Sequence, residues 1–241
     1  MYGNEMNEGI WDIHCHILPG IDDGSRNWDM TLQMIRQSWD AGVRTMIATP
    51  HYLPWRNRLK KETVLSLVEE ANQKVRTELG IEMRILLVEE LYYHNDLIKE
   101  LEEGKALTMA GTRYVLVEFS EGAPYSEIRM AAERFRRSPW KLIIAHVERY
   151  GALRKNQNLD EILSMDVELQ SNAEEMQRGM FDSTKRWLRK RYDAQDISYI
   201  GSDAHDPVKR PPLSDKSLKW FREHLDTEYR FMLFSGNHFG N

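Results

Sequence analysis

Residues 43–51 read VRTMIATPH, a short apolar run with β-branched residues that ends in a histidine. Six similar runs are spread along the chain, and longer stretches with apolar residues at helical spacing separate them. This alternation is typical of β-α units around a mostly parallel sheet. The seven predicted strands are Ile10–Ile13, Val43–Ala48, Met83–Val88, Tyr114–Val117, Leu142–Ala145, Asp166–Leu169 and Ile197–Ile200.

Four amphipathic helices are expected between these strands. Glycine just past a helix, proline in its first turn and serine at its N-cap are common boundary residues. Two predicted helices cover residues 28–41, before Gly42, and residues 63–79, before Gly80. Two more are predicted to begin at Pro124 and at Ser214. No internal repeat or Ser/Gly-rich linker offers a domain boundary, so we expect a single domain over residues 1–241.

The composition of the chain excludes several classes of protein. A net charge of −5 over 241 residues gives no reason to expect a nucleic-acid partner. No apolar run approaches the ~18 residues that would span a bilayer, and the first residues lack the pattern of an export signal. The one cysteine, Cys15, excludes an intrachain disulfide and fits a reducing compartment, so we expect a cytoplasmic protein.

Histidines and acidic residues stand at or just after the C-terminal ends of the predicted strands. The carboxyl ends of parallel strands meet at one face, so side chains placed there converge on one site. Mutually repulsive carboxylates gathered there would be stabilised by metal cations. The candidate ligands are His14, His16, His51, Glu89, Glu90, Glu118, His146, Asp203 and His205, with Asp22 or Asp23 on the turn after the first pair.

Spacing supports a metal site. Side chains alternate along an extended segment, so His14 and His16 point to the same side and can bind one ion. Asp203 and His205 repeat this spacing. Mixed imidazole and carboxylate ligands favour Mn, Fe, Zn or Co over Ca or Mg.

An ordered set of motifs between residues 12 and 205 resembles a known family. The motifs are DIHCHILPGIDDG, ATPHY, VEELYY, YVLVEFS, IIAHVERY, LQSNA and GSDAH. They resemble the polymerase and histidinol phosphatase (PHP) family, in its bacterial manganese-dependent protein-tyrosine phosphatase branch, which regulates capsule and exopolysaccharide synthesis. The resemblance implies a distorted seven-stranded β/α barrel with three divalent metal ions, Mn first and Fe, Co or Zn as alternatives. The implied substrate is phosphotyrosine in the tail of a bacterial tyrosine kinase.

The resemblance also implies a ligand set. It gives His14, His16, Glu90 and Asp203 for one ion, Glu90, Glu118 and His146 for a second, and Asp23, His51 and His205 for the third. Val88 and Val147 stand where the family usually has glycine and proline. Glu89 therefore remains an alternative to Glu90 as the bridging ligand, as Asp22 does to Asp23.

Such a site suits phosphomonoester hydrolysis. Clustered cations lower the pKa of a shared water towards ~7, which provides hydroxide, and they bind the phosphoryl oxygens. Arg149 and Arg210 could bind a phosphate oxygen through their planar donor groups, so they join Asp23 as candidate catalytic residues. A tyrosine ester releases a phenolate with a pKa near ~10, so it needs little general-acid help.

Other functions remain as alternatives. A cysteine-dependent phosphatase is excluded, because Ile21 stands where that mechanism needs an arginine six residues after Cys15. Cys15 is expected to pack on the back of its strand. A related phosphoesterase acting on histidinol phosphate or nucleotides, or a silent metal-binding module, stays open. Tyr52, Trp55, Tyr92 and Tyr93 could line a phenyl-binding wall or simply pack, whereas His94, His224 and His238 lie outside the expected site.

Overall fold

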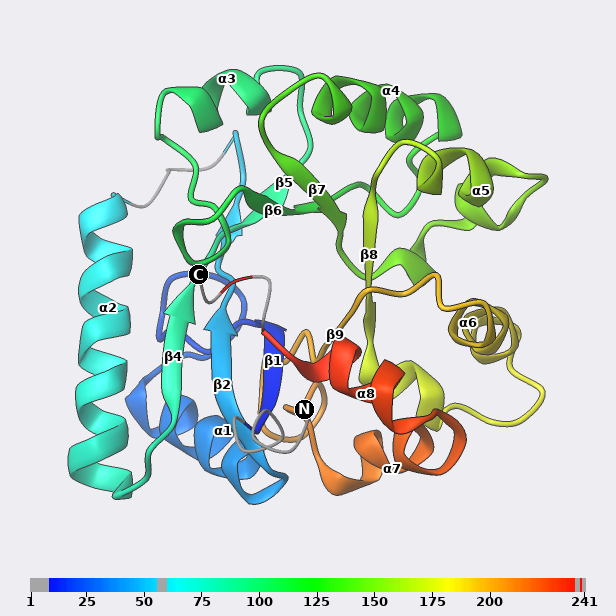
Figure 1. Cartoon of the computed structure of the whole chain (residues 1–241). Coiled ribbons are helices and arrows are strands. Elements are labelled where there is room, and N and C mark those ends of the chain that lie inside the picture. Colours follow the sequence, from blue (N-terminus) through cyan, green and yellow to red (C-terminus); the bar gives the residue numbers. More distant parts are fainter. Residues whose placement is uncertain (1–8, 56–59, 237–238, 240–241) are drawn as a thin grey trace.

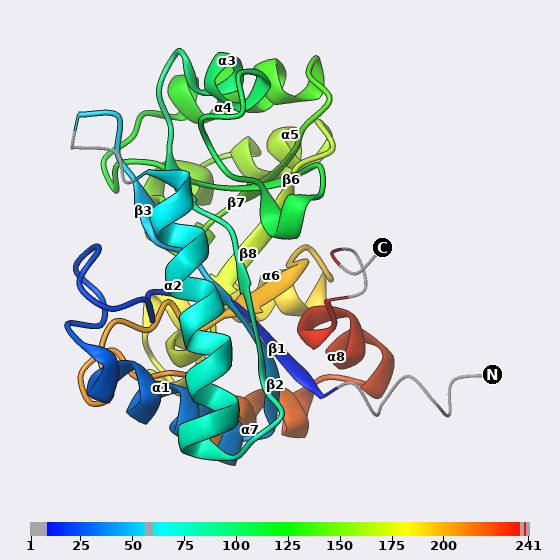
Figure 2. The same cartoon turned by 90° about the vertical axis from the view of Figure 1, so that its left-hand side faces the viewer.

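A computed structural model of the protein describes residues 9–55, 60–236 and 239. Within these residues, nine parallel strands in two sheets form a half-barrel with helices around its outside (Figures 1 and 2). The strands are β1 Ile10–Cys15, β2 Val43–Ala48, β3 His51–Tyr52, β4 Arg84–Leu87, β5 Glu90–Tyr92, β6 Tyr114–Glu118, β7 Lys141–Ile144, β8 Glu168–Asn172 and β9 Tyr199–Gly201.

The strands belong to two sheets, with the orders β1-β2-β4 and β3-β5-β6-β7-β8-β9. Backbone hydrogen bonds continue the pairing from one sheet to the other: Val88 N–H donates to Ala48 O, and Glu90 N–H to Pro50 O. At the opposite edges Asp203 N–H, beyond β9, donates to His14 O of β1 at 2.7 Å. The predicted parallel α/β class is confirmed, whereas a closed seven-stranded barrel stays a prediction.

Eight α-helices connect the strands in the described part of the chain. They are α1 Trp28–Asp40, α2 Lys61–Lys74, α3 Leu97–Glu102, α4 Tyr125–Arg136, α5 Asn158–Leu163, α6 Ser183–Asp193, α7 Asp215–His224 and α8 Thr227–Phe234. Figure 1 shows α2 beside β4 and α4 beyond β7, both outside the strands. Among the described residues, no helix is both long and apolar enough to cross a bilayer.

The predicted helix boundaries agree with the structure. Gly80 ends a π-helical extension of α2 in the left-handed conformation, with φ of 63°. Pro124 precedes α4 as its N-cap. The Ser214 hydroxyl accepts from Ser217 N–H and so caps α7, which ends at His224.

The strand predicted to begin at Asp166 begins two residues later in the structure, at Glu168. Asp166 was expected to open a strand, but its φ of 64° is left-handed and its N–H donates to Leu163 O in a turn. Extended pairing starts at Glu168 and runs on to Asn172. Because this strand continues beyond Leu169, it carries further polar side chains towards the end of the sheet where the histidines lie.

Two hydrophobic clusters hold the fold together. The smaller one contains Trp11, Ile13, Ile47, Leu116 and Ile143 from several strands, packed among themselves. The larger one fills the space between strands and helices and includes Cys15, whose thiol donates to Ile47 O. The predicted packing role of Cys15 is therefore confirmed. Burial of apolar surface on both faces fixes the strand ends that carry the polar residues.

Candidate metal centre

The side chains predicted as ligands lie at or just beyond the carboxyl ends of β1, β6, β7 and β9, or at the start of the short strands β3 and β5, which follow β2 and β4. His14 belongs to β1, His51 to β3, Glu90 to β5 and Glu118 to β6; His16 and Asp23 follow β1, His146 follows β7, and Asp203 and His205 follow β9. The structure brings all nine into one continuous cluster.

Glu90 lies at the centre of this cluster and is 1% exposed. Its Oε1 atom lies 2.8 Å from His146 Nε2 and 3.2 Å from His14 Nε2. Its Oε2 atom lies 3.2 Å from His16 Nε2 and 3.1 Å from His51 Nδ1. A carboxylate with both oxygens directed at imidazoles on either side has the geometry to bridge two cations.

Asp203 adds a second acid on the side of the first histidine pair. Its Oδ1 atom lies 3.6 Å from His14 Nε2 and 3.5 Å from His16 Nε2. The two Nε2 atoms are themselves only 3.3 Å apart. Donor atoms of these three residues all lie within 4.8 Å of one another, so they can share one ion.

Glu118 faces the other side of the cluster. Its Oε1 atom lies 3.0 Å from His51 Nδ1, and its Oε2 atom lies 3.8 Å from His146 Nε2. His51, Glu90 and Glu118 form a second group of donors within 4.8 Å. Glu90 thus contacts the residues of both groups.

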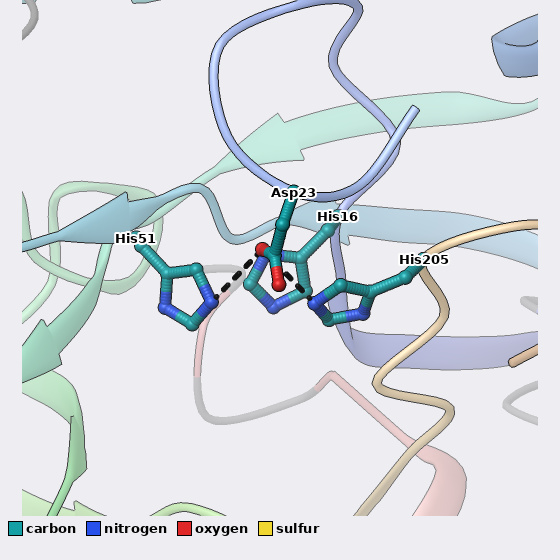
Figure 3. Close-up of side chains that lie close together, drawn as sticks. All are labelled: His16, Asp23, His51 and His205. Atoms are coloured by element: carbon teal, nitrogen blue, oxygen red, sulfur yellow. Dashed lines mark ion pairs between the residues drawn. The ribbon is translucent and has the colours of Figure 1, made fainter. Parts of the chain in front are cut away.

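Figure 3 shows a third group, in which three imidazoles converge on the carboxylate of Asp23. Asp23 Oδ1 lies 3.3 Å from His51 Nε2 and 3.4 Å from His205 Nε2. His16 joins them, since its ring centroid is 4.0 Å from that of His205. Donor atoms of all four residues lie within 4.8 Å. Because His16 and His51 also belong to the other groups, the three groups share side chains.

Asp22 and Asp23 are adjacent but have different contacts. Asp22 Oδ2 lies 2.9 Å from His16 Nδ1, on the ring edge that faces away from Glu90. Its Oδ1 atom accepts from Gly24 N–H and so fixes the turn. A carboxylate that accepts from the outer nitrogen of a histidine leaves the inner nitrogen free for a metal. Asp22 therefore orients His16, while Asp23 faces the imidazoles directly.

Glu89 and Glu90 differ in the same way. Glu89 Oε2 accepts from Leu107 N–H at 2.8 Å, in the loop after α3. The side chain of Glu90, one position later, points to the opposite face of the extended chain and contacts the histidines. This geometry favours Glu90 as the ligand that joins the groups.

Gln170 and Asn172 are two site residues whose role the sequence did not predict. His14 Nδ1–H donates to Gln170 Oε1 at 3.1 Å, and His146 N–H donates to the same oxygen at 2.7 Å. Gln170 Nε2 donates to Asn172 Oδ1, and Asn172 Nδ2 donates to Asp203 Oδ2, both at 3.0 Å. Both side chains point from β8 towards the cluster. Asn172 ends β8 in the LQSNA motif, and this strand-end position was the available signal, whereas Gln170 lies within the strand.

Two arginines border the cluster on Asp203. The guanidinium of Arg210 lies 2.7 Å from Asp203 Oδ2, and that of Arg149 pairs with the same oxygen. Both side chains remain about one-third exposed, at 36% and 31%. They therefore combine a fixed position beside the cluster with access to solvent.

Two ligand candidates have strained backbones. His146 has φ of 32° and Asp203 has φ of 52°, in the left-handed region that non-glycine residues rarely adopt. A strained backbone persists only where the surrounding structure holds it in place, and such residues concentrate at functional sites. Here it turns two side chains into the cluster immediately after β7 and β9.

Charge complementarity shifts the pKa values within the cluster. Burial disfavours the charged imidazole, but the attraction of Glu90 and Asp203 outweighs it and raises the pKa of His14. Burial opposes ionisation of Glu90 as well, yet the histidines, His14 foremost, hold its pKa well below the usual range. The acids are thus kept ionised and need positive partners, which protonated imidazoles or metal cations can provide.

The cluster fits a metal on chemical grounds. Three buried atoms that face it, His51 Nδ1, Glu90 Oε2 and His205 Nε2, make no well-formed hydrogen bond in the part of the chain that the structure describes, although each lies within 3.4 Å of an ionisable group of the cluster. Buried polar atoms without such a bond are rare and call for a ligand. Imidazole nitrogens and carboxylate oxygens are donors for Mn, Fe, Co or Zn.

The histidines excluded from the site lie elsewhere or outside the described residues. His94 Nε2 lies 3.1 Å from Glu100, in an ion pair near α3. His224 ends α7, where its ring stacks on Trp220. His238 lies outside the described residues.

The parallel half-barrel and the cluster at its strand ends define an α/β protein with a candidate metal centre. The chain belongs to the capsular polysaccharide synthesis family CpsB/CapC, whose model matches residues 10–239.

Curated relatives that match along most of their length have a named activity. The chain is 28% identical over 235 residues to the tyrosine-protein phosphatase CpsB of Streptococcus agalactiae, which covers 94% of this chain and 95% of the relative. It is 26% identical over 227 residues to the tyrosine-protein phosphatase YwqE of Bacillus subtilis, over 92% of this chain and 87% of the relative.

Solved structures share the fold. One structure, from work on the metal-dependent tyrosine phosphatases YwqE of Bacillus subtilis and CpsB of Streptococcus pneumoniae, superposes with a TM-score of 0.85 at 24% identity, over 93% of this chain and 91% of that one. A histidinol phosphate phosphatase from Lactococcus lactis, solved with zinc, L-histidinol and phosphate, gives a TM-score of 0.57 at 12% identity, over 89% and 91%.

Proposed function

We propose that this chain is a metal-dependent protein-tyrosine phosphatase that hydrolyses phosphotyrosine. The observation that carries the proposal is Glu90, which lies within 3.2 Å of His14, His16, His51 and His146. The curated relatives named as tyrosine-protein phosphatases, matched along almost their whole length, support the same reaction.

The proposed ligand set consists of the nine side chains of the cluster. Three divalent cations, Mn in the first place, would be held by His14, His16, Asp23, His51, Glu90, Glu118, His146, Asp203 and His205. When bound, such cations supply Lewis-acid activation of a water and neutralise charge on phosphoryl oxygens.

The residues of the chain have separate tasks in this reaction. Arg149 and Arg210 would bind the nonbridging oxygens of the phosphate, because their guanidinium groups are anchored on Asp203 and still reach solvent. Gln170 would hold His14 in the orientation that directs Nε2 inwards. The phenolate leaves without a dedicated acid because its pKa is near ~10.

A thiolate mechanism does not fit this chain. Burial raises the pKa of the Cys15 thiol well above its usual value, and the acids Asp12 and Asp203 add to the effect. The thiol is fully buried and donates to Ile47 O. A nucleophilic cysteine requires a lowered pKa and access to the substrate.

The wider setting is also proposed. We infer that residues 1–241 act as one domain whose strands close into a seven-stranded barrel, in which β2 with β3 and β4 with β5 each count as one strand. The hydrogen bonds that link the two sheets support this inference. The proposed protein substrate is the tail of a bacterial tyrosine kinase, and the proposed compartment is the cytoplasm, in keeping with the single buried thiol of Cys15.

Steady-state kinetics on purified, metal-loaded protein test the function. A phosphotyrosine peptide, the matching phosphoserine peptide and histidinol phosphate are compared, and the highest kcat/KM is expected for phosphotyrosine. Faster turnover of histidinol phosphate would overturn the proposal. Protein that retains metal but hydrolyses no aryl phosphate would instead identify a silent metal-binding module.

A matched pair of variants assigns the activity to the cluster. His51→Ala removes a side chain that contacts Asp23, Glu90 and Glu118, and it should abolish turnover. His224→Ala removes an exposed histidine on α7 and should retain wild-type rates. Equal activity of both variants would place the reaction elsewhere.

A further inference from the structure

Two aromatic side chains, one just after β3 and one at the end of β5, form a right-angled pair. The rings of Trp55 and Tyr92 lie 4.6 Å apart between centroids, with an angle of 80° between their planes. Trp55 is 63% exposed, which is unusual for so large an apolar side chain. The pair therefore presents two perpendicular ring surfaces, with one of its members largely open to solvent.

The strand β5 places Tyr92 two residues beyond Glu90 of the cluster. Glu90 and Tyr92 are two residues apart, so their side chains project from the same face of the strand. Two residues of extended chain advance about 7 Å. Tyr92 also lies opposite Glu118 in the register of β5 and β6. The tyrosine is thus the next side chain outwards from the metal donors on this face.

The neighbouring tyrosines are placed differently. Tyr93 follows Tyr92 and shares the opposite face with the buried Leu91; its ring packs on Phe119 at 5.2 Å. Tyr52 is 4% exposed, and its hydroxyl donates to Glu100. Both therefore pack in the interior, so of the four aromatic candidates only Trp55 and Tyr92 are placed to meet a substrate.

We propose that Trp55 and Tyr92 form a subsite that binds the phenyl ring of the phosphotyrosine substrate. This inference rests on the proposed function. The ring of an aryl phosphate is bonded to a phosphoryl oxygen, so it lies just outside the phosphate when the phosphate is at the metal cluster. A third ring can stack on one member of a right-angled pair and meet the other edge-to-face.

The subsite explains a preference that the metal cluster alone does not. The cations and Arg149 and Arg210 recognise phosphate, which every phosphomonoester carries. Serine phosphate and small alcohol phosphates have no ring to fill the aromatic corner. The contact therefore selects aryl phosphates at the binding step, in addition to their better leaving group.

Binding of two nonhydrolysable probes tests the subsite. Phenylphosphonate and methylphosphonate are titrated into the metal-loaded protein by calorimetry. Aromatic pairs contribute about 0.5–1.5 kcal/mol beyond buried area, so Trp55→Ala should weaken phenylphosphonate about 2- to 10-fold and leave methylphosphonate unchanged. Trp55→Phe should restore most of the loss. With phosphotyrosine peptide, Trp55→Ala should raise KM and leave kcat close to the wild-type value.

The control is Met232→Ala, which removes an exposed apolar side chain on α8, and it should change neither affinity. Equal weakening of both phosphonates by Trp55→Ala, or no weakening of either, would overturn the subsite. These outcomes differ from failure of the proposed function, because a protein that binds phenylphosphonate through Trp55 but hydrolyses no phosphotyrosine would retain the subsite and lose the assigned reaction.

Discussion

Gln170 holds His14 by a hydrogen bond of 3.1 Å from His14 Nδ1–H to Gln170 Oε1. The ring is buried, and its other nitrogen, Nε2, faces Glu90 and Asp203. The bond therefore fixes both the tautomer and the direction of a candidate ligand from outside the cluster.

Gln170→Ala should lower metal affinity and turnover by about 10- to 100-fold, the usual effect of removing such an outer partner. His14 and the His146 N–H would both lose their acceptor. Chelator competition measures the affinity. Gln37→Ala, which removes a glutamine side chain bonded to Pro207 O, is the control. Unchanged metal affinity in Gln170→Ala would show that His14 needs no such support.

Substitutions of Asp22 and Asp23 in the first loop should differ in their effects on metal content and on kcat. Asp23→Ala removes a carboxylate that faces His51 and His205, so at least one bound metal should be lost together with most of the activity. Asp22→Asn retains an acceptor for His16 and should keep the full metal content with a smaller loss of rate. Elemental analysis and measurement of kcat for both variants show which aspartate is the ligand. The reverse order would make Asp22 the ligand.

Arg149→Ala should leave the metals bound and weaken phosphate recognition. Asp203 keeps Arg210 on the same oxygen, so its charge remains partnered. We expect kcat/KM for phosphotyrosine peptide to fall about 100-fold, as for loss of one preorganised donor. Metal content is measured in the same samples. Wild-type kinetics would remove Arg149 from the reaction.

Gly201→Ala should destabilise the fold at the site. A Cβ atom at this position of β9 would lie 2.5 Å from His14 Cβ and 3.0 Å from Gln170 Nε2. Overpacking of this kind costs about 1–3 kcal/mol, so thermal unfolding should occur at lower temperature. At Gly122 an added Cβ meets nothing within 4 Å, so Gly122→Ala is the control. Equal stability of the two variants would contradict the close packing of β9 against β1.

The sequence predicts the positions of the main strands because their apolar runs are buried on both sides. Val43–Ala48 has the predicted bounds. The two- and three-residue strands β3 and β5 are too short to give a periodic pattern, although they carry His51 and Glu90. The boundary at Asp166 could not be predicted either, because the sequence does not distinguish a polar residue in a left-handed turn from a polar residue that begins a strand.

The site could be located from the sequence but not resolved in detail. Histidines after separate strands indicate one site because parallel strands end together. Adjacent acids such as Asp22 and Asp23 have the same chemistry, and only the path of the loop separates them. Gln170 carries no signal of its own, because an amide in a strand is equally suited to a structural role.

The proposed reaction requires that buried histidines and acids hold cations that drive phosphotyrosine hydrolysis. The most direct measurement is the metal content of the purified protein, paired with its rate on a phosphotyrosine peptide before chelation, after chelation and after addition of Mn, Fe, Co or Zn singly. We predict up to three bound cations per chain, loss of the rate with the metal and its recovery with Mn. An undiminished rate in metal-free protein would contradict the account.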